Sequence, residues 1–387
     1  MKITDIKTYV LQYNLDRRLG YSQKWFKTRT AHLVEVRTDE GLNGWGEAHG
    51  PGSVALANKA IIEHVLKPFV VGMDPFDVEL IWHRMYNGIR DYGQKGMPIQ
   101  CMSGIDIALW DIMGKATGRP LYRLLGGKFR DRIMAYAYGM LFRDVPNLSR
   151  EFADEASGLV RHGFKAVKMK VGRSPKEDAE LASAVRFAVG NDILVMADAN
   201  HAYTPREAIP LGRRLERLEF HWFEEPVAPE DYEGYVEVKN ALDMPVAGGE
   251  AEYTKYGFRE LIKRRCVDVL QPEICALGGL TEYKKVLAMA QAEGIPVIPH
   301  VWGSEIALAV SLHVVAALPD MPGAVTPAQP MVEYDTTPNE LRDHLAKEPL
   351  GIMDQVKQSG GFVAVPERPG IGIEPNDDAV HKYRIDK

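Results

Sequence analysis

The sequence has few cysteines and no long apolar run. Only Cys101, Cys266 and Cys275 occur among its 387 residues. An odd, low count without a CxxC spacing argues against a disulfide framework and against a structural zinc knuckle. No stretch approaches the roughly 20 apolar residues of a membrane span, and the polar start MKITDIKTYVLQYNLD is unlike a signal peptide. These absences predict a cytoplasmic protein that does not associate with a membrane.

An excess of positive charge is also lacking. The formal net charge is −6 and no basic run occurs, which argues against nucleic acid as a partner. No GxGxxG motif follows the early strand candidates, so a dinucleotide site is not expected. What is present is ordinary for a globular protein, with 45% hydrophobic and 26% charged residues. The length allows a large core and two domains.

Residues 1–125 predict an α+β domain. Residues 2–13 and 31–39 alternate in the manner of strands. Between them, residues 19–30 (LGYSQKWFKTRT) are aromatic, basic and unpatterned, which predicts a loop. Three segments with helical periodicity follow, at 54–68, 75–90 and 103–116.

Residues 126–348 predict a barrel of alternating strands and helices. Short apolar runs alternate with charged amphipathic segments such as 175–190 and 257–265. The strand candidates are 133–139, 166–171, 193–200, 221–226, 245–250, 268–273, 296–302 and 331–335. Eight strands with helices between most of them favour an α/β barrel over an open sheet. The Gly- and Pro-rich strands of residues 349–387 suggest a return to the first domain.

Three equally spaced acids each close one of these apolar runs: Asp198, Glu224 and Glu250. The carboxyl ends of barrel strands line the active site, so the three are expected to converge. Hard oxygen ligands favour Mg²⁺ or Mn²⁺ over zinc, and buried acids repel one another unless a cation neutralises them. Any one alone could instead be a helix cap or a surface acid. The common register of all three favours a metal site.

Two lysines share one face of a barrel strand, because Lys168 and Lys170 are two residues apart. A lysine acts as a base only if its pKa falls. A second ammonium, desolvation and a nearby divalent cation would all lower that pKa. The alternative is a solvated lysine face, which fits poorly because helices cover the outside of barrel strands.

His300 ends the apolar run PVIPH on a strand expected opposite Lys170, so the two side chains could flank one substrate carbon. Glu273 is placed to hydrogen-bond one ring nitrogen and to fix the tautomer. A lone histidine is more often structural, so a catalytic role depends on these neighbours. Together they suit removal of a proton α to a carboxylate, with Mg²⁺ stabilising the ene-diolate. Lys170 or His300 would be the base and the other an acid.

At these residues the sequence resembles the enolase superfamily, and within it the mandelate racemase subgroup. The segments VKMK, DAN, WFEEP, AGGE, QPE and PHVWG follow the order of that family over nearly the whole chain. WFEEPVAPE and DANHAYT are especially similar to sugar-acid dehydratases and galactarolactone cycloisomerases. The resemblance implies an α+β capping domain on a (β/α)₇β barrel, a small-molecule acid-sugar or sugar-lactone substrate, and a homo-oligomer.

The resemblance also implies a ligand set and a base. Mg²⁺, with Mn²⁺ as an alternative, would be held by Asp198, Glu224 and Glu250. Lys170 would be the base, with Lys168 beside it.

Further roles follow for the other side of the site. His300 would be the opposing acid or base, Glu333 would hydrogen-bond the substrate carboxylate, and Asn200 would bind that carboxylate or its enolate. One departure stands out, since Glu273 replaces the Asp of the usual QPD. The extra methylene leaves open whether His300 acts as base, acid or binder.

The leading hypothesis is therefore a Mg²⁺-dependent acid-sugar dehydratase. A lactone cycloisomerase is second and a racemase or epimerase third. A Schiff-base aldolase, which would not need the three acids, and a non-catalytic sugar-acid binder are alternatives of other classes. Candidate substrate-binding residues are Tyr21, Trp25, His49 and Trp302, although each could be ordinary packing.

Overall fold

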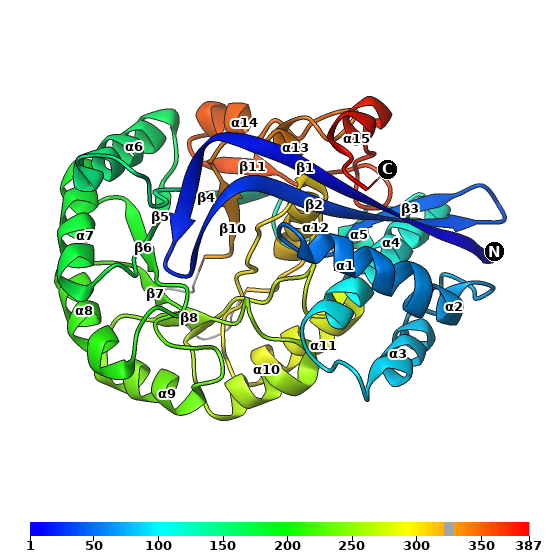
Figure 1. Cartoon of the computed structure of the whole chain (residues 1–387), viewed down its shortest axis with the longest axis horizontal. Helices are drawn as coiled ribbons and strands as arrows, with labels where there is room; N and C mark the ends of the chain where they lie inside the picture. The colour runs from blue at the N-terminus through cyan, green and yellow to red at the C-terminus, as the bar shows by residue number, and fades with distance from the viewer. Residues whose placement is uncertain (321–328, 387) are drawn as a thin grey trace.

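The computed structural model describes residues 1–320 and 329–386. Residues 321–328 of the predicted barrel region and Lys387 of the predicted C-terminal segment lie outside the described residues. A ring of strands is surrounded by an arc of helices, and a long antiparallel hairpin reaches across the ring (Figure 1). In the described part of the chain, no helix is both long and apolar enough to cross a membrane.

The first domain carries a three-stranded antiparallel sheet of β1 (Ile3–Tyr21), β2 (Lys24–Thr38) and β3 (Asn43–Glu47). The prediction of a loop at 19–30 is wrong, because the hairpin runs through it and Tyr21 pairs with Lys24. A register shift between Asn14 and Leu19 interrupts the alternation of side chains. That bulge concealed the strand pattern in the sequence.

Helices pack on one side of this sheet. They are α1 (Val54–Ala60), the π-helical turn η1 (Ile61–Leu66), α2 (Lys67–Val70), α3 (Val78–Ile89), α4 (Met97–Thr117) and α5 (Leu121–Leu124). The three predicted helical segments are confirmed, although α4 begins six residues earlier than 103. Helix α4 lies against β3 because β3 is glycine-rich: a Cβ added at Gly46 would stand 2.1 Å from the carbonyl oxygen of Gly104.

The barrel strands are parallel and lie in chain order around the ring. They are β4 (Arg132–Tyr138), β5 (Ala166–Lys170), β6 (Leu194–Asp198), β7 (Trp222–Glu224), β8 (Val246–Gly248), β9 (Val269–Leu270) and β10 (Met331–Asp335), with β10 beside β4. The helices are α6 (Leu148–His162), α7 (Pro175–Val189), α8 (Pro205–Arg217), α9 (Tyr232–Ala241), α10 (Thr254–Lys263), α11 (Gly279–Ala292) and α12 (Glu305–Ala316). The predicted barrel and capping domain are confirmed.

The predicted strand at 296–302 is not a regular strand. It makes isolated parallel bridges, Leu270 to Val297 and Glu273 to His300, which place it beside β9. Pro296 lacks an N–H, as does the proline that precedes His300, so a full ladder cannot form. The segment still occupies the eighth position of the barrel.

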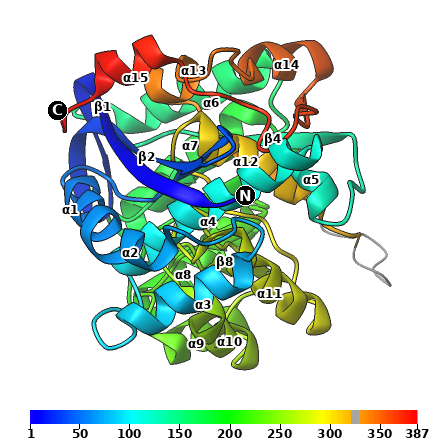
Figure 2. The same ribbon diagram turned by 90° about the vertical axis from the view of Figure 1, so that its right-hand side faces the viewer.

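The C-terminal segment contacts both domains. It follows the short helix α13 (Glu340–Asp343) and contains α14 (Ile352–Ser359), β11 (Phe362–Ala364) and α15 (Asp377–Tyr383). Strand β11 pairs antiparallel with the barrel strand β4. The chain end meets the first domain, where the Ile385 N–H donates to the Val10 carbonyl at 2.9 Å. Figure 2 shows this end beside β1.

Alternation along the strands separates an apolar floor from a charged mouth. The inward residues at the start of each strand form one apolar cluster: Met134, Tyr136, Ala166, Met196, Trp222, Ala247, Val269, Ile298 and Met331. Side chains two residues further along point the same way. Lys168, Asp198 and Glu224 follow Ala166, Met196 and Trp222 by this step, so they face inward above the floor.

Candidate active site

The three acids converge as the sequence predicts. Asp198 lies beside Glu224 in the β6–β7 register, and each of Asp198, Glu224 and Glu250 offers an oxygen within 4.8 Å of the others. Burial raises the pKa of Glu224 to about 7, although Lys168 lowers it. Burial also raises the pKa of Asp198, but Lys170 and Lys168 outweigh it and the net pKa is lowered.

The donor set fits a divalent cation. The Oε2 atoms of Glu225 and Glu250 are buried without a hydrogen-bond partner in the described structure. Burial, together with Glu250 and Asp198, raises the pKa of Glu225 well above its usual value. Mg²⁺ or Mn²⁺ would bind such crowded carboxylate oxygens, which lack hydrogen-bond donors. Glu225, which follows Glu224, has a φ of +42° and is not one of the three acids whose oxygens meet within 4.8 Å.

Two further side chains hold Glu224 in place. Its Oε2 accepts hydrogen bonds from Trp222 Nε1 at 2.9 Å and from Gln271 Nε2 at 2.8 Å. Such bonds to a ligand carboxylate fix its orientation. Gln271 was not predicted, although its place in QPE beside Glu273 was a usable signal.

The lysines lie among the acids. Lys168 Nζ is fully buried, 2.6 Å from Glu224 Oε1 and 2.7 Å from Glu333 Oε1. Lys170 Nζ donates to Asp198 and, at 2.6 Å, to Asn200 Oδ1. The predicted lowering of the lysine pKa depends in part on a bound cation, so it stays a prediction. Burial lowers both values, but the paired carboxylates outweigh it and raise the pKa of each lysine.

A cation on the acids would change that balance. Coordination would neutralise Asp198 and Glu224. The Glu224 charge raises the pKa of Lys168 most, and the Asp198 charge raises the pKa of Lys170 most. The ammonium of Lys170 would then lose its strongest partner. The basicity of this lysine would then depend on the bound cation.

His300 and Glu273 form the predicted pair. His300 Nδ1 lies 2.8 Å from Glu273 Oε2, so the longer side chain of Glu273 does reach the ring. The other Glu273 oxygen accepts from the Cys275 N–H at 2.8 Å. His300 Nε2 lies 3.3 Å from Glu250 Oε2. Burial lowers the pKa of His300, but Glu250 and Glu273 outweigh it and raise it to about 10.

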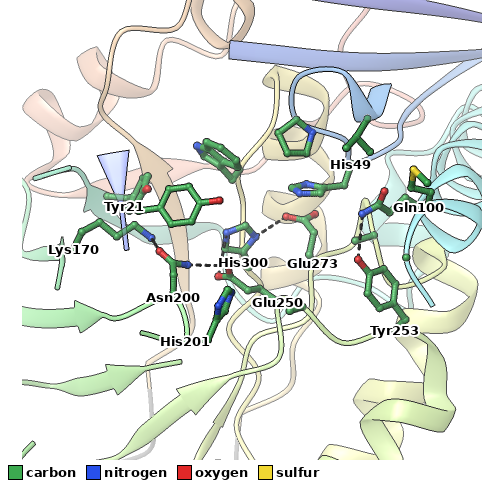
Figure 3. Close-up of a pocket in the computed structure, with 18 residues that line it drawn as sticks. Tyr21, His49, Gln100, Lys170, Asn200, His201, Glu250, Tyr253, Glu273 and His300 are labelled. Carbon is green, nitrogen blue, oxygen red and sulfur yellow. Dashed lines mark hydrogen bonds and ion pairs between the residues drawn. The ribbon is translucent and has the colours of Figure 1, made fainter. Parts of the chain in front are cut away.

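These groups adjoin a cavity of about 350 Å³ between the two domains (Figure 3). Its wall includes the following predicted residues: Tyr21, His49, Lys170, Asn200, Glu250, Glu273, His300 and Trp302. Lys168, Asp198, Glu224 and Glu333 are buried and do not line it. The cavity thus brings Lys170 and His300 together from different strands.

The structure corrects the prediction for Trp25, which does not line the cavity. Neighbouring side chains on a strand point to opposite faces. Phe26 faces inward, with its ring 5.7 Å from that of Trp302. Trp25 therefore points outward, packs over Gly20 and stays 39% exposed.

Part of the wall was not foreseen. Gln100 at the start of α4 and Tyr253 after β8 line the cavity, and Gln100 Nε2 donates to the Tyr253 hydroxyl at 3.2 Å. Tyr138 and His201 also line it. A polar residue in an apolar helix is a weak signal, because most such residues are structural. Only the packing of the two domains brings Gln100 to this site.

A carboxylate of the first domain holds the loop that follows His300. Glu47, in the GWGEA segment, accepts hydrogen bonds from Ser304 Oγ at 2.6 Å and from the Ala307 N–H at 3.2 Å. The Ser304 N–H donates to both of its oxygens, at 3.0 and 3.1 Å. Glu47 thus caps α12 across the domain boundary.

Two family matches cover most of the chain. Residues 6–126 match the N-terminal domain of the mandelate racemase / muconate lactonizing enzyme family, and residues 151–379 match the family described as enolase C-terminal domain-like. Two curated relatives match over almost their full length. The D-galactarolactone cycloisomerase of Agrobacterium fabrum is 40% identical, with 100% of this chain and 99% of the relative covered. The arabinonate dehydratase of Saccharolobus solfataricus is 36% identical, with 99% of each covered.

Solved structures share the fold. The 3,6-anhydro-D-galactonate cycloisomerase from Zobellia galactanivorans is 38% identical, covers 100% of both chains and gives a TM-score of 0.88. A racemase from Streptomyces coelicolor with bound magnesium is 26% identical, covers 99% of this chain and 100% of that one, and gives a TM-score of 0.87.

Proposed function

The chain belongs to the mandelate racemase and muconate lactonizing enzyme family of the enolase superfamily, and we propose that it removes the proton α to the carboxylate of an acid sugar and then expels a β-oxygen substituent. Its relatives are named dehydratases and cycloisomerases, so it is an enzyme of the lyase or isomerase class. The specific reaction and the metal dependence are our proposal.

One observation carries the proposal: Lys170 and His300 line the same cavity from different strands, with Glu250 between them. Asn200, bonded to Lys170, lies 3.2 Å from one Glu250 oxygen, and His300 lies 3.3 Å from the other. A substrate carbon held over Glu250 would have an amine on one side and an imidazolium on the other. Such a pair can take a proton and give one in a single site.

Each side chain then has a role. Lys170 takes the α-proton, and His300, whose pKa is raised to about 10, delivers a proton to the leaving oxygen. Asp198, Glu224 and Glu250 would hold Mg²⁺, which when bound stabilises negative charge on the substrate carboxylate.

Lys168 and Glu333 support these groups. The buried Lys168 ammonium adds positive charge beneath the substrate carboxylate. Both oxygens of Glu333 are engaged, one with Lys168 at 2.7 Å and one with the Val301 N–H at 3.0 Å. We assign Glu333 the role of holding Lys168 and the loop after His300, in place of the predicted contact with substrate.

The leaving group separates two candidate reactions. Loss of water gives the dehydratase reaction, which is the leading candidate. Loss of a ring oxygen gives a cycloisomerase. The second candidate is favoured by the two cycloisomerases that are 40% and 38% identical over the full chain. Racemisation, the third candidate, needs a neutral His300 as a second base, and none of the relatives reported above at 36% identity or more is named a racemase.

Incubation of acid sugars and their lactones in D₂O with Mg²⁺, followed by NMR, tests the proposal. We expect deuterium at the α-carbon and a product that has lost water or opened its ring. Lys170→Ala should abolish exchange, whereas His300→Asn should retain exchange and lose elimination. Exchange that survives in Lys170→Ala would overturn the assignment of the base. Activity in EDTA with a borohydride-trapped lysine adduct would instead indicate an aldolase, and binding without exchange a non-catalytic binder.

A further inference from the structure

The cavity has two chemically different ends. Lys170 and Tyr21 stand on one side of His300, and Gln100 and Tyr253 on the other (Figure 3). We call the second side the far wall, formed by His49, Gly96, Met97, Gln100 and Tyr253. It receives whatever part of the substrate lies beyond the carbon that reacts.

Cationic groups are absent from the far wall. Of all the residues that line the cavity, which belong to the described part of the chain, only Lys170 is a lysine or arginine. It stands among the metal-site acids, where the proposed chemistry places the first carboxylate. Glu273 also lines the cavity, but its carboxylate is paired with His300 at 2.8 Å. A second carboxylate on the substrate would find no lysine or arginine partner among the described residues of the far wall.

The start of α4 does not replace the missing cation. A helix N-terminus binds anions through its free N–H groups. Here Pro98 has no N–H, and the N–H groups of Ile99 and Gln100 donate to the Gly96 carbonyl at 3.0 and 3.1 Å. In the described structure only the Met97 N–H of the first turn remains, which is too little to hold a carboxylate.

Exposed lysines near the mouth are also unsuitable. Lys95 precedes α4, but its Nζ pairs with Glu252 at 2.6 Å. Lys24 at the hairpin tip is exposed and does not line the cavity. The far wall therefore has no built anion site.

Neutral polar groups are plentiful there. Gln100 Nε2 donates to Tyr253, and Gln100 Oε1 lies 3.4 Å from the Asn58 amide that also holds the His49 carbonyl at 2.9 Å. This chain of contacts fixes the side chains of Gln100 and Tyr253 while leaving the tyrosine hydroxyl hydrogen and one amide hydrogen to donate. The His49 backbone is held at both ends, since its N–H donates to the Cys275 carbonyl at 2.9 Å. Preorganised neutral donors and acceptors suit hydroxyl or ring oxygens.

We infer that the substrate carries a single carboxylate and presents an uncharged tail, either hydroxylated or closed as a ring, to the far wall formed by His49, Gln100 and Tyr253. Aldonates, their anhydro forms and lactones with one free carboxylate fit this wall, and aldarates with two free carboxylates do not. The inference rests on the proposed function, which supplies the site for the first carboxylate.

Matched substrate pairs test the inference. Galactonate and galactarate, or gluconate and glucarate, share their stereochemistry and differ only at C6, which is a hydroxymethyl group in the first and a carboxylate in the second. We expect the aldonate, or a lactone with one free carboxylate, to have a kcat/KM at least about 100-fold higher than the diacid, because the second carboxylate would be desolvated without a cationic partner. A diacid that is turned over as well as its aldonate would overturn the inference and leave the proposed elimination standing. Failure of every acid sugar to exchange its α-proton would instead overturn the proposed function.

A charge added to the far wall supplies a second test. Met97 is 41% exposed at the rim, so Met97→Arg should not disturb the core. We expect it to raise the ratio of diacid to aldonate kcat/KM by about tenfold, and Met97→Gln to leave that ratio near the wild-type value. Tyr92→Arg adds the same charge at a side chain that is 88% exposed and outside the cavity, so it should leave the ratio unchanged. An equal shift in Tyr92→Arg and Met97→Arg would show that the far wall does not select for charge.

Discussion

Replacement of Glu47 by Gln should loosen the loop that carries His300. Three donors face this carboxylate: the Ser304 N–H, the Ser304 hydroxyl and the Ala307 N–H. An amide can keep one oxygen toward them, but its NH₂ group then faces the Ser304 N–H, and the charge that assists the bonds is lost. We expect a local cost of about 2 kcal/mol.

Hydrogen exchange measures this cost directly. A local free-energy loss of about 2 kcal/mol should speed exchange of the Ser304 and Ala307 amides about 30-fold. Burial raises the pKa of Glu47 to about 7, so the measurement is made at pH 8, where the carboxylate is ionised. With the loop loosened, elimination should slow while α-proton exchange by Lys170 continues.

Glu35→Gln is the matched control. Glu35 is as buried as Glu47 and lies on the adjacent strand, but it bonds within the first domain, to Tyr9 at 2.7 Å, Arg37 at 2.9 Å and Asn43 at 3.0 Å. Its substitution should leave exchange at 304–307 unchanged. Unaltered exchange in Glu47→Gln, or equal acceleration in Glu35→Gln, would refute the reasoning.

Three further predictions concern pH and packing. Burial lowers the pKa of His32 from 6.5 to about 4, so its contribution to stability is present above pH 6.5 and lost as the pH falls through 4. Between pH 7 and pH 5, the free energy of unfolding of His32→Leu, measured with urea, should therefore fall by about 2 kcal/mol less than that of the wild type. An equal fall in the two proteins would contradict this. Glu273→Asp should lose the 2.8 Å contact to His300 and so lower the pKa of His300. In a pH–rate profile, the pH above which elimination slows should then move downward. An unchanged profile would assign the raised pKa of His300 to Glu250 alone. Gly46→Ala places a Cβ 2.1 Å from the Gly104 carbonyl oxygen and should cost about 3 kcal/mol in thermal unfolding. Gly158→Ala in α6 is the control, because the atom nearest to an added Cβ there stands 3.9 Å away, and it should be neutral or stabilising. Similar melting temperatures for the two variants would argue against close β3–α4 packing.

The sequence predicted the parts of the site that depend on local rules. Asp198 and Glu224 were found because strand parity and parallel register place the ends of successive strands side by side. The segment 296–302 was predicted as a strand from its apolar residues, yet its prolines limit it to bridges. Local rules thus located the eighth barrel position without giving its hydrogen bonding.

The rest depends on contacts between distant segments. Gln100 and Tyr253 meet only because α4 packs against the barrel mouth, 153 residues apart in the chain. The raised pKa of Lys170 follows from its distance to Asp198, which no spacing in the sequence determines. The cavity-lining residues of the hairpin could not be distinguished from their neighbours, because residues 19–30 were predicted as a loop and the two faces of β2 were therefore not separated.

The last residues of the chain also protect the sheet edge at β1. Arg384 bridges Leu11, and the Val10 N–H donates to Asp386 Oδ1 at 3.1 Å, so the tail occupies hydrogen-bonding groups that an edge strand would otherwise offer. Unprotected edges recruit strands from other molecules. A chain that lacks these few residues would keep the whole barrel and the metal-site acids, but the edge of β1 would be free to pair with strands of other molecules. The solubility of a trimmed or C-terminally fused form thus depends on a segment far from the chemistry.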